Sequence, residues 1–377
     1  MFENFAGGKS GLFFLVFGMV TAVLVGVSVA VVFYVADIAL EDPDEIIVDD
    51  AASPIYVNFQ PEPEAVVSED AYLAMGQYQA EFPMPQNVVV LQGQTTVEII
   101  GYMLNHFSGG LGVNCSHCHT LENFAADEWD DPVGMRNKMV ARQHLVMTGE
   151  INQNWLEYDQ LVNLTNLKQP SGSVMACATC HNGQAQPVAW SASLDALPDD
   201  FRLPLDATFS VTEPGILNVN ARDDEISLET VQYNQYVMYH MNDSLGVGCT
   251  HCHNSRYFPS YEGVPAKNYS LHMLQMSAFI NENYSKYIGG QQPSCSLCHN
   301  GQVIPYGAAI NDSVLPPHLR SNPPEGLSIE ELGLDASMYE RYTEHDLSAD
   351  NPFYNQEAVS EGDADATDDD ASVGMGG

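Results

Sequence analysis

The sequence predicts a mainly α-helical protein with extensive loops, and three observations support that fold class. Four segments combine helical periodicity, good helix formers and no internal proline. Pro/Gly-rich connections such as Gln169–Ser173 and Pro204–Gly215 separate them and predict loops. One sequence pattern occurs twice along the chain, which predicts two related halves. The four predicted helices are Val97–Phe107, Val133–Trp155, Leu228–Met241 and Tyr269–Tyr287.

An uncharged run of 27 residues, Ser10–Ala36, lies near the N-terminus. About 20 apolar residues span a bilayer, so the run predicts one N-terminal transmembrane anchor helix, residues 10–36. A cleaved signal peptide is the alternative, but the run is long for a signal peptide and no clean cleavage site follows it. Lys9 and the acids after the run favour a cytoplasmic N-terminus at residues 1–9. Residues 37–95 are expected to form an extended periplasmic strap with one short strand at Asn87–Leu91.

All eight cysteines fall in four copies of the pentapeptide C-x-x-C-H, the attachment site of a c-type haem. Two thiols three positions apart can each form a thioether to one edge of a porphyrin, and the adjacent imidazole becomes the proximal iron ligand. Zinc sites and redox dithiols also use C-x-x-C pairs, but neither needs a His after the second Cys four times over. A chain of this length does not need a disulfide framework to fold. The sequence therefore predicts four covalently bound haem c groups. Their cysteines are Cys115 and Cys118, Cys177 and Cys180, Cys249 and Cys252, and Cys295 and Cys298, with proximal ligands His119, His181, His253 and His299.

The repeat divides the motifs into two pairs. Tyr102–Cys115 resembles Val237–Cys249, and His144–Trp155 resembles Met273–Tyr284. The same Asn-Gly-Gln tripeptide follows the second and fourth motifs. We therefore expect a first dihaem half at residues 96–215, a second at 216–350, and an acidic tail at 351–377.

An iron that only carries electrons needs a second axial ligand, and the helices upstream of the motifs supply candidates. Met103 lies 12 residues before Cys115 and Met238 lies 11 before Cys249, so a thioether is expected to reach the distal face of the first and third haems. Core packing is the alternative for any single Met, but the matching positions in two repeats favour ligation. His144 and Met273 occupy equivalent positions on the other two helices and are the candidates for the second and fourth haems. Met147 and Met276, which are equivalent to each other one turn further on, stay open as core residues or ligands, and Met139 is a further candidate if His144 is not a ligand. We interpret His106, His240 and His272 as packing or solvent-facing.

The chain carries 50 acids against 12 bases, a net charge of −38. Such a surface excludes nucleic acid, whose phosphates it repels, and favours a cationic partner attracted over long range. Part of the excess lies outside the predicted body, because residues 41–50 hold six acids and residues 357–370 hold seven. The alternative is that the acids only keep a large surface soluble.

With these motifs, the chain resembles the tetrahaem cytochrome c subunit of the purple-bacterial photosynthetic reaction centre. The resemblance covers about residues 60–350. It rests on the four motifs, the internal repeat, the stretch Met147–Trp155 and the Cys-His-Asn-Gly-Gln ends of the second and fourth motifs.

The resemblance implies an electron-transfer subunit and not an enzyme. It would pass electrons from a soluble periplasmic carrier through four haems to the photo-oxidised bacteriochlorophyll special pair. It further implies contact with the reaction-centre membrane subunits and the antenna complex, and a single-pass location in the inner photosynthetic membrane with the haem domain in the periplasm. The third haem would lie nearest the special pair and the first farthest away. Two alternatives are a membrane-anchored multihaem donor to a respiratory or periplasmic reductase, and a multihaem reductase itself.

The chain departs from the family pattern at three places. Many relatives are tethered by a lipidated N-terminal Cys, whereas this chain has no cysteine outside the motifs, so we expect the helix to be the anchor. The family usually has Met at the position of His144. It usually has a His shortly after the equivalent of Trp155, where this chain has Tyr158, so the distal ligand of the fourth haem stays open.

Overall fold

The computed structural model describes residues 17–19, 21, 54–156, 172–187, 197–198, 200–205, 227–258, 260 and 265–334. The chain divides into two compact units, Met1–Ser53 and Pro54–Gly377. The first unit has only residues 17–19 and 21 described, so most of the predicted anchor helix at 10–36 lies outside the described residues, as does the acidic tail. Within the described part of the chain, no helix combines the length and the apolar character needed to cross a membrane.

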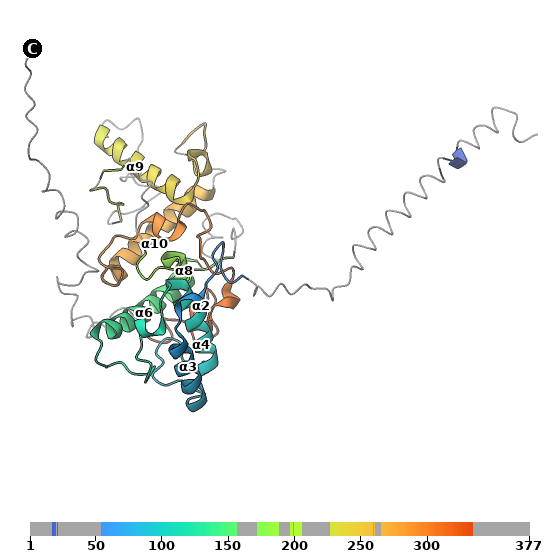
Figure 1. Ribbon diagram of the computed structural model, residues 1–377. Coiled ribbons are helices and arrows are strands. Elements are labelled where there is room, and N and C mark those ends of the chain that lie inside the picture. Colours follow the sequence, from blue (N-terminus) through green and yellow to red (C-terminus); the bar gives the residue numbers. More distant parts are fainter. Residues whose placement is uncertain are drawn as a thin grey trace, which may run out of the picture. The chain divides into compact units, whose positions relative to one another are not determined.

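The second unit is mainly helical with long loops (Figure 1). Its described backbone contains no strands and only isolated β-bridges: Tyr56 and Val174 each pair with Ala309, and Thr120 pairs with Asn123. The α-helices are α2 (Pro63–Val66), α3 (Glu69–Glu81), α4 (Thr96–Tyr102), α5 (Gly109–Leu111), α6 (Pro132–Glu150), α8 (Cys177–His181), α9 (Leu228–Leu245), α10 (Pro265–Tyr284) and α11 (Cys295–His299). The short η elements are π-turns at η1 (Met103–Ser108) and η3 (Ile151–Trp155) and 3₁₀ turns at η2 (Cys115–His117), η4 (Cys249–His251), η5 (Ser285–Tyr287), η6 (Asp312–Val314) and η7 (Pro317–Leu319).

All four predicted helices are present, and local chemistry fixes where they begin. A capping box between Thr95 and Glu98 starts α4, and the side chain of Ser227 caps α9. Asp131 caps α6, where Pro132 occupies the first turn and needs no hydrogen-bond acceptor. The helices α4 and α6 both continue as π-turns, η1 and η3, an irregularity that often marks a functional site.

The prediction of an extended strap at residues 37–95 is wrong in one respect, because α3 is a 13-residue helix within it. The side chain of Ser68 accepts from Ala71 N, and Glu69 and Asp70 lie in the first turn, where negative charge is favourable. The prolines that suggested a strap flank this helix but do not interrupt it. The strand expected at Asn87–Leu91 is also absent, since that segment consists of bends without ladder partners.

Two glycines allow neighbouring motif segments to pack closely. Gly112 ends the helix before the first motif at φ +67°, and a Cβ there would lie 2.1 Å from the carbonyl oxygen of Gly183, just after the second motif. Gly246 ends α9 at φ +64°, and a Cβ there would lie 2.3 Å from the carbonyl oxygen of Gly301, just after the fourth motif. Each contact is completed by a 2.8 Å backbone hydrogen bond, Gly183 N to Gly110 O and Gly301 N to Ser244 O.

The stretch at the end of α6 connects distant segments through two amide side chains. The fully buried Asn152 donates to the carbonyls of Met175 and Leu319 and accepts from Met175 N. Gln153 donates to His318 O and accepts from Ile329 N. These bonds hold the segment before the second motif and the C-terminal loops against α6, because buried backbone groups require such partners.

Candidate haem sites

The histidine that ends each motif is held in the same way at all four sites. Its Nδ1 lies 2.9–3.0 Å from a backbone carbonyl oxygen a few residues downstream. An Nδ1–H that donates to a carbonyl fixes the tautomer and leaves Nε2 with its lone pair free for a metal. The four pairs are His119 with Phe124, His181 with Gln184, His253 with Phe258, and His299 with Gln302.

The first motif opens into a largely apolar cavity of about 170 Å³. Cys118 and His119 line it together with Met103, so the structure brings the predicted distal Met to the same cavity as the motif. Met103 begins the π-turn η1. Burial, with the positive charge of Lys138 second in importance, lowers the pKa of His119 to about 4, which keeps the imidazole neutral and able to ligate iron.

Burial raises the pKa of several motif thiols, to about 12 for Cys118 and Cys295 and to about 11 for Cys177. Within the described residues, no three His, Cys, Asp or Glu side chains converge as a zinc site requires.

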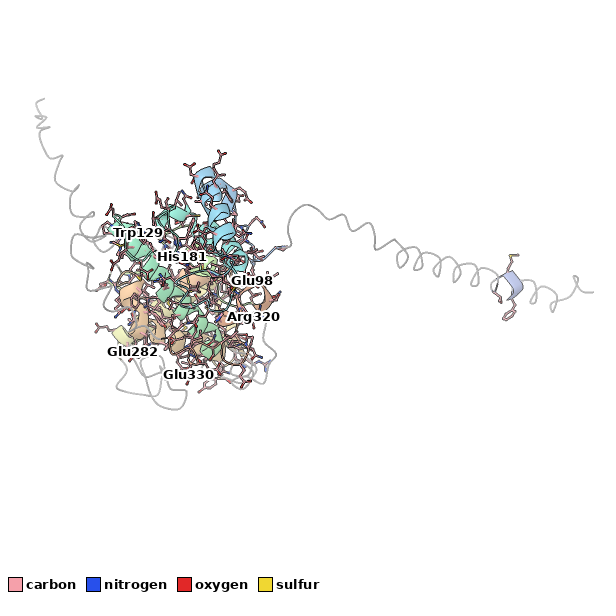
Figure 2. All side chains as sticks on the ribbon, turned by 90° about the horizontal axis from the view of Figure 1, so that it is seen from below. Glu98, Trp129, His181, Glu282, Arg320 and Glu330 are labelled. Carbon is pink, nitrogen blue, oxygen red and sulfur yellow. The ribbon has the colours of Figure 1, made fainter. Side chains whose placement is uncertain are left out.

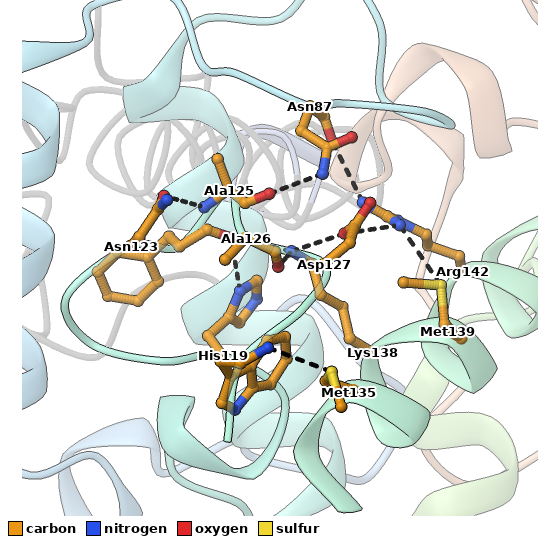
Figure 3. Close-up of polar contacts among 12 residues, drawn as sticks. Asn87, His119, Asn123, Ala125, Ala126, Asp127, Met135, Lys138, Met139 and Arg142 are labelled. Atoms are coloured by element: carbon orange, nitrogen blue, oxygen red, sulfur yellow. Dashed lines mark hydrogen bonds and ion pairs between the residues drawn. The ribbon is translucent and has the colours of Figure 1, made fainter. Parts of the chain in front are cut away.

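A buried charge cluster lies beside the first motif (Figure 3). Asp127 pairs with Lys138 at 3.2 Å and with Arg142 at 3.0 Å, and both basic side chains line the first cavity. Burial alone would raise the pKa of Asp127, but hydrogen bonds from Asn87 and Arg142 and the two positive charges outweigh it and lower the pKa. The sequence analysis did not predict this cluster. The available signal was that Lys138 and Arg142, two of only 12 bases in the chain, lie within one predicted helix.

The second motif faces a cavity of about 240 Å³ that Cys177, Cys180 and His181 line. The predicted distal ligand His144 lines the same cavity, and its ring centroid lies 5.8 Å from that of His181. His144 Nε2 lies 2.9 Å from Tyr287 O, so one nitrogen of its ring is engaged by a carbonyl. The alternative ligand Met147 also lines this cavity. Figure 2 labels His181 among the side chains of this unit.

Two of the predicted methionines pack on apolar clusters that cysteines of the fourth motif also contact. Met273 and Cys298 both pack against the apolar cluster that contains Met276, whereas Met238 and Cys295 both pack against a second cluster around Val237. Cys295 belongs to the fourth motif, so this cluster does not test the predicted pairing of Met238 with His253, which stays a prediction. Met139 is buried and its sulfur lies 3.5 Å from Arg142 Nη1.

The histidines interpreted as packing or solvent-facing are all buried and hydrogen-bonded. His106 Nδ1 lies 2.7 Å from the hydroxyl of Tyr56, and its Nε2 lies 3.1 Å from Val314 O. His240 accepts from Cys295 N, and His272 Nε2 lies 2.8 Å from Trp155 O. Packing is therefore the correct interpretation for all three, and solvent exposure is wrong.

The four motifs form a series in space. The helix end before the first motif contacts α8, which carries the second motif; α8 contacts α11, which carries the fourth; and α11 contacts α9, which leads to the third. In Figure 1, α8 accordingly lies between the α2–α4 group and α9. The sulfurs of Cys180 and Cys298 are 3.2 Å apart, too far for a disulfide and close enough to place the second and fourth motifs side by side.

A helical, loop-rich body with repeated C-x-x-C-H motifs, a carbonyl-held histidine at each and apolar cavities beside them defines a c-type cytochrome. A sequence model of the family described as photosynthetic reaction centre cytochrome C subunit matches residues 68–200 and 206–269, more than half of the chain. The chain belongs to this family. The family match favours a photosynthetic electron-transfer role over the respiratory alternative.

Curated relatives agree with this placement. Cytochrome c-554 of Chloroflexus aurantiacus is 28% identical over 331 residues, covering 64% of this chain and 76% of that protein. The photosynthetic reaction center cytochrome c subunit of Rubrivivax gelatinosus is 25% identical over 237 residues, covering 52% of this chain and 60% of that protein. The corresponding subunit of Roseobacter denitrificans is 24% identical over 297 residues, covering 66% and 76%.

Proposed function

We propose that this chain carries electrons, by means of four covalently bound c-type haems, from a soluble periplasmic carrier to the photo-oxidised bacteriochlorophyll pair of a reaction centre. The observation that carries the proposal is the common geometry of the four motif histidines, each with Nδ1 held by a backbone carbonyl. Bound haem would supply reversible one-electron chemistry. The chain would supply attachment, axial ligands and exclusion of water.

For the first site we propose Cys115 and Cys118 as thioether partners, His119 as proximal ligand and Met103 as distal ligand. The shared cavity supports this assignment. By analogy between the repeats, Cys249, Cys252, His253 and Met238 form the third site. This correspondence, and the paired contacts of Gly112 and Gly246, support a body of two related dihaem halves.

The second site is proposed to be bis-histidine, through His181 and His144. The 5.8 Å ring separation and the shared cavity support it. Ligation has to use the nitrogen of His144 that Tyr287 O does not engage, or else exchange that hydrogen bond. For the fourth site we propose His299 and Met273, since Met273 and Cys298 pack on one cluster.

The contacts among the motif helices support the order first, second, fourth, third for the proposed binding sites. Together with the family resemblance, this order puts the first site at the end away from the membrane and the third nearest the special pair. We further propose that residues 10–36 anchor the chain in the photosynthetic membrane, with the body in the periplasm against the reaction-centre membrane subunits and the antenna complex. The chain is proposed to catalyse no bond chemistry.

The surface around the first site suits a cationic donor. Residues 54–135 contain eleven Asp or Glu and no Lys or Arg. Most of these acids are exposed, including Glu64, Glu69 and Asp70 on α2 and α3, and Met75 and Tyr78 of α3 line the first cavity. An excess of exposed negative charge in this segment would accelerate encounter with a positively charged partner.

The test is purification of the chain from the host's photosynthetic membranes. We expect bacteriochlorophyll to co-purify with it and a flash to oxidise its c-type haems. Co-purification with a respiratory or periplasmic reductase instead would contradict the proposal. Carbon monoxide binding to the reduced protein would reveal an open iron and favour the enzyme alternative.

A further inference from the structure

The proximal histidines of the first and third motifs share their carbonyl with a lysine. Phe124 O accepts from His119 Nδ1 at 2.9 Å and from Lys138 Nζ at 3.1 Å. In the second half, Phe258 O accepts from His253 Nδ1 at 3.0 Å and from Lys267 Nζ at 2.9 Å. A carbonyl oxygen has two lone pairs, so it can accept both bonds.

The other two motifs differ at this position. His181 and His299 are held by the carbonyls of Gln184 and Gln302, in the tight Asn-Gly-Gln turn directly after each motif. In the described part of the chain, no lysine donates to either of these carbonyls. The four sites therefore fall into two classes, which alternate along the sequence.

We infer that Lys138 and Lys267 raise the reduction potentials of the first and third haem sites relative to the second and fourth. This inference rests on the proposed function, because it needs haem at these motifs. A positive charge near the iron disfavours the ferric state, which carries one more positive charge than the ferrous state. The same ammonium also draws electron density from the carbonyl, so the carbonyl pulls less on the imidazole N–H and the imidazole donates less to iron.

The two lysines should differ in strength. Lys138 is 6% exposed and forms a cluster with Arg142 and Asp127, and this cluster of two cations and one anion keeps a net positive charge. Lys267 Nζ makes its bond to Phe258 O at the surface, where water screens the charge. The effect at the first site should therefore exceed the effect at the third.

The experiment is a redox titration of the haem-loaded protein, following the low-spin haem bands of each variant. Lys138→Met should lower one midpoint, with the reduction equilibrium changed on the order of tenfold, or about 59 mV for one electron. Lys267→Met should lower a different midpoint by less. Lys138→Arg should restore most of the loss, and Lys138→Gln, which keeps a donor without charge, should behave like Lys138→Met.

Arg320→Met is the matched control, since Arg320 donates to the carbonyl of Leu315, which holds no motif histidine. Three outcomes would overturn the inference. No midpoint potential moves in either Lys→Met variant, the same midpoint moves in both, or Arg320→Met shifts a midpoint by an equal amount. A wild-type midpoint in Lys138→Gln would also overturn it, because the charge would then have no role. Each variant is first checked for four haems and an unchanged low-spin spectrum. A wild-type protein without four c-type haems contradicts the proposed function, whereas unmoved midpoints in a four-haem protein contradict only this inference.

Discussion

Replacing Gly112 by Ala tests whether the close contact between the first and second motif segments determines the stability of the haem domain. Gly112 has φ +67°, and its added Cβ would lie 2.1 Å from Gly183 O. Gly93 offers a matched control, because it has φ +78° but no heavy atom within 4 Å of the added Cβ. Both changes impose the same left-handed backbone on Ala, and only Gly112→Ala adds a clash.

The two variants should differ by several kcal/mol. Left-handed backbone costs Ala about 1–2 kcal/mol at either site. At Gly112, moving the turn away costs about 1–3 kcal/mol of packing and weakens the hydrogen bond from Gly183 N to Gly110 O, worth about 1 kcal/mol. We therefore expect a loss of about 3–6 kcal/mol for Gly112→Ala and about 1–2 kcal/mol for Gly93→Ala.

The assay is thermal unfolding of the haem-loaded proteins, followed by far-UV circular dichroism after the haem count is shown to be equal. At about 2 °C per kcal/mol for a body of this size, the unfolding midpoint should fall by about 6–12 °C for Gly112→Ala and by about 2–4 °C for Gly93→Ala. Gly246→Ala should resemble Gly112→Ala, since its Cβ would meet Gly301 O at 2.3 Å. Equal losses for Gly112→Ala and Gly93→Ala would refute the role of the contact.

A pyridine haemochrome assay should give four c-type haems per chain that denaturation does not release, and a lower count would mean that one motif is not loaded. His144→Met should raise one midpoint potential because Met ligation favours the ferrous state; if His144→Ala leaves every haem low-spin with unaltered potentials, His144 is not a ligand. Re-reduction of flash-oxidised haems should slow as ionic strength rises, because salt limits the range of the attraction for a cationic donor to about 8–10 Å. Reduction of the special pair within the complex should not slow, and deleting residues 357–377 should change the re-reduction rate little. A second-order rate that stays flat or rises with salt would exclude a cationic donor. Asp127→Asn should cost about 2 kcal/mol at neutral pH, since it leaves Lys138 and Arg142 buried without their anion. The pKa of Asp127 is lower in the folded protein, so its contribution to the free energy of unfolding is complete above the unfolded pKa of about 4 and disappears as pH falls through the folded pKa. The stability of Asp127→Asn should therefore decline less than that of the wild type as pH falls. An identical decline in both proteins would exclude this role of Asp127.

The sequence by itself determined the chemistry of this protein, because covalent haem attachment needs a local motif. C-x-x-C-H places two thiols and an imidazole close together along the chain, so the eight cysteines and the four candidate proximal histidines could be predicted without a fold. The helix periodicity that predicted Val133–Trp155 and Leu228–Met241 is local in the same sense, and both helices are present. The strap was misread because prolines and acids flank α3, while its cap at Ser68 gave the better signal.

Only the tertiary structure decided which distant residues meet at each site. The contact of Cys180 with Cys298 and the order of the motifs join segments far apart in the chain, and no local pattern specifies such pairings. The lysines are the clearest case. Lys138 and Lys267 lie 14 and 9 residues beyond the phenylalanines whose carbonyls they reach, so their relation to the motif histidines depends on how α6 and α10 fold back over the motifs. Helix packing brings the charges to the carbonyls, and burial determines how strongly each one acts.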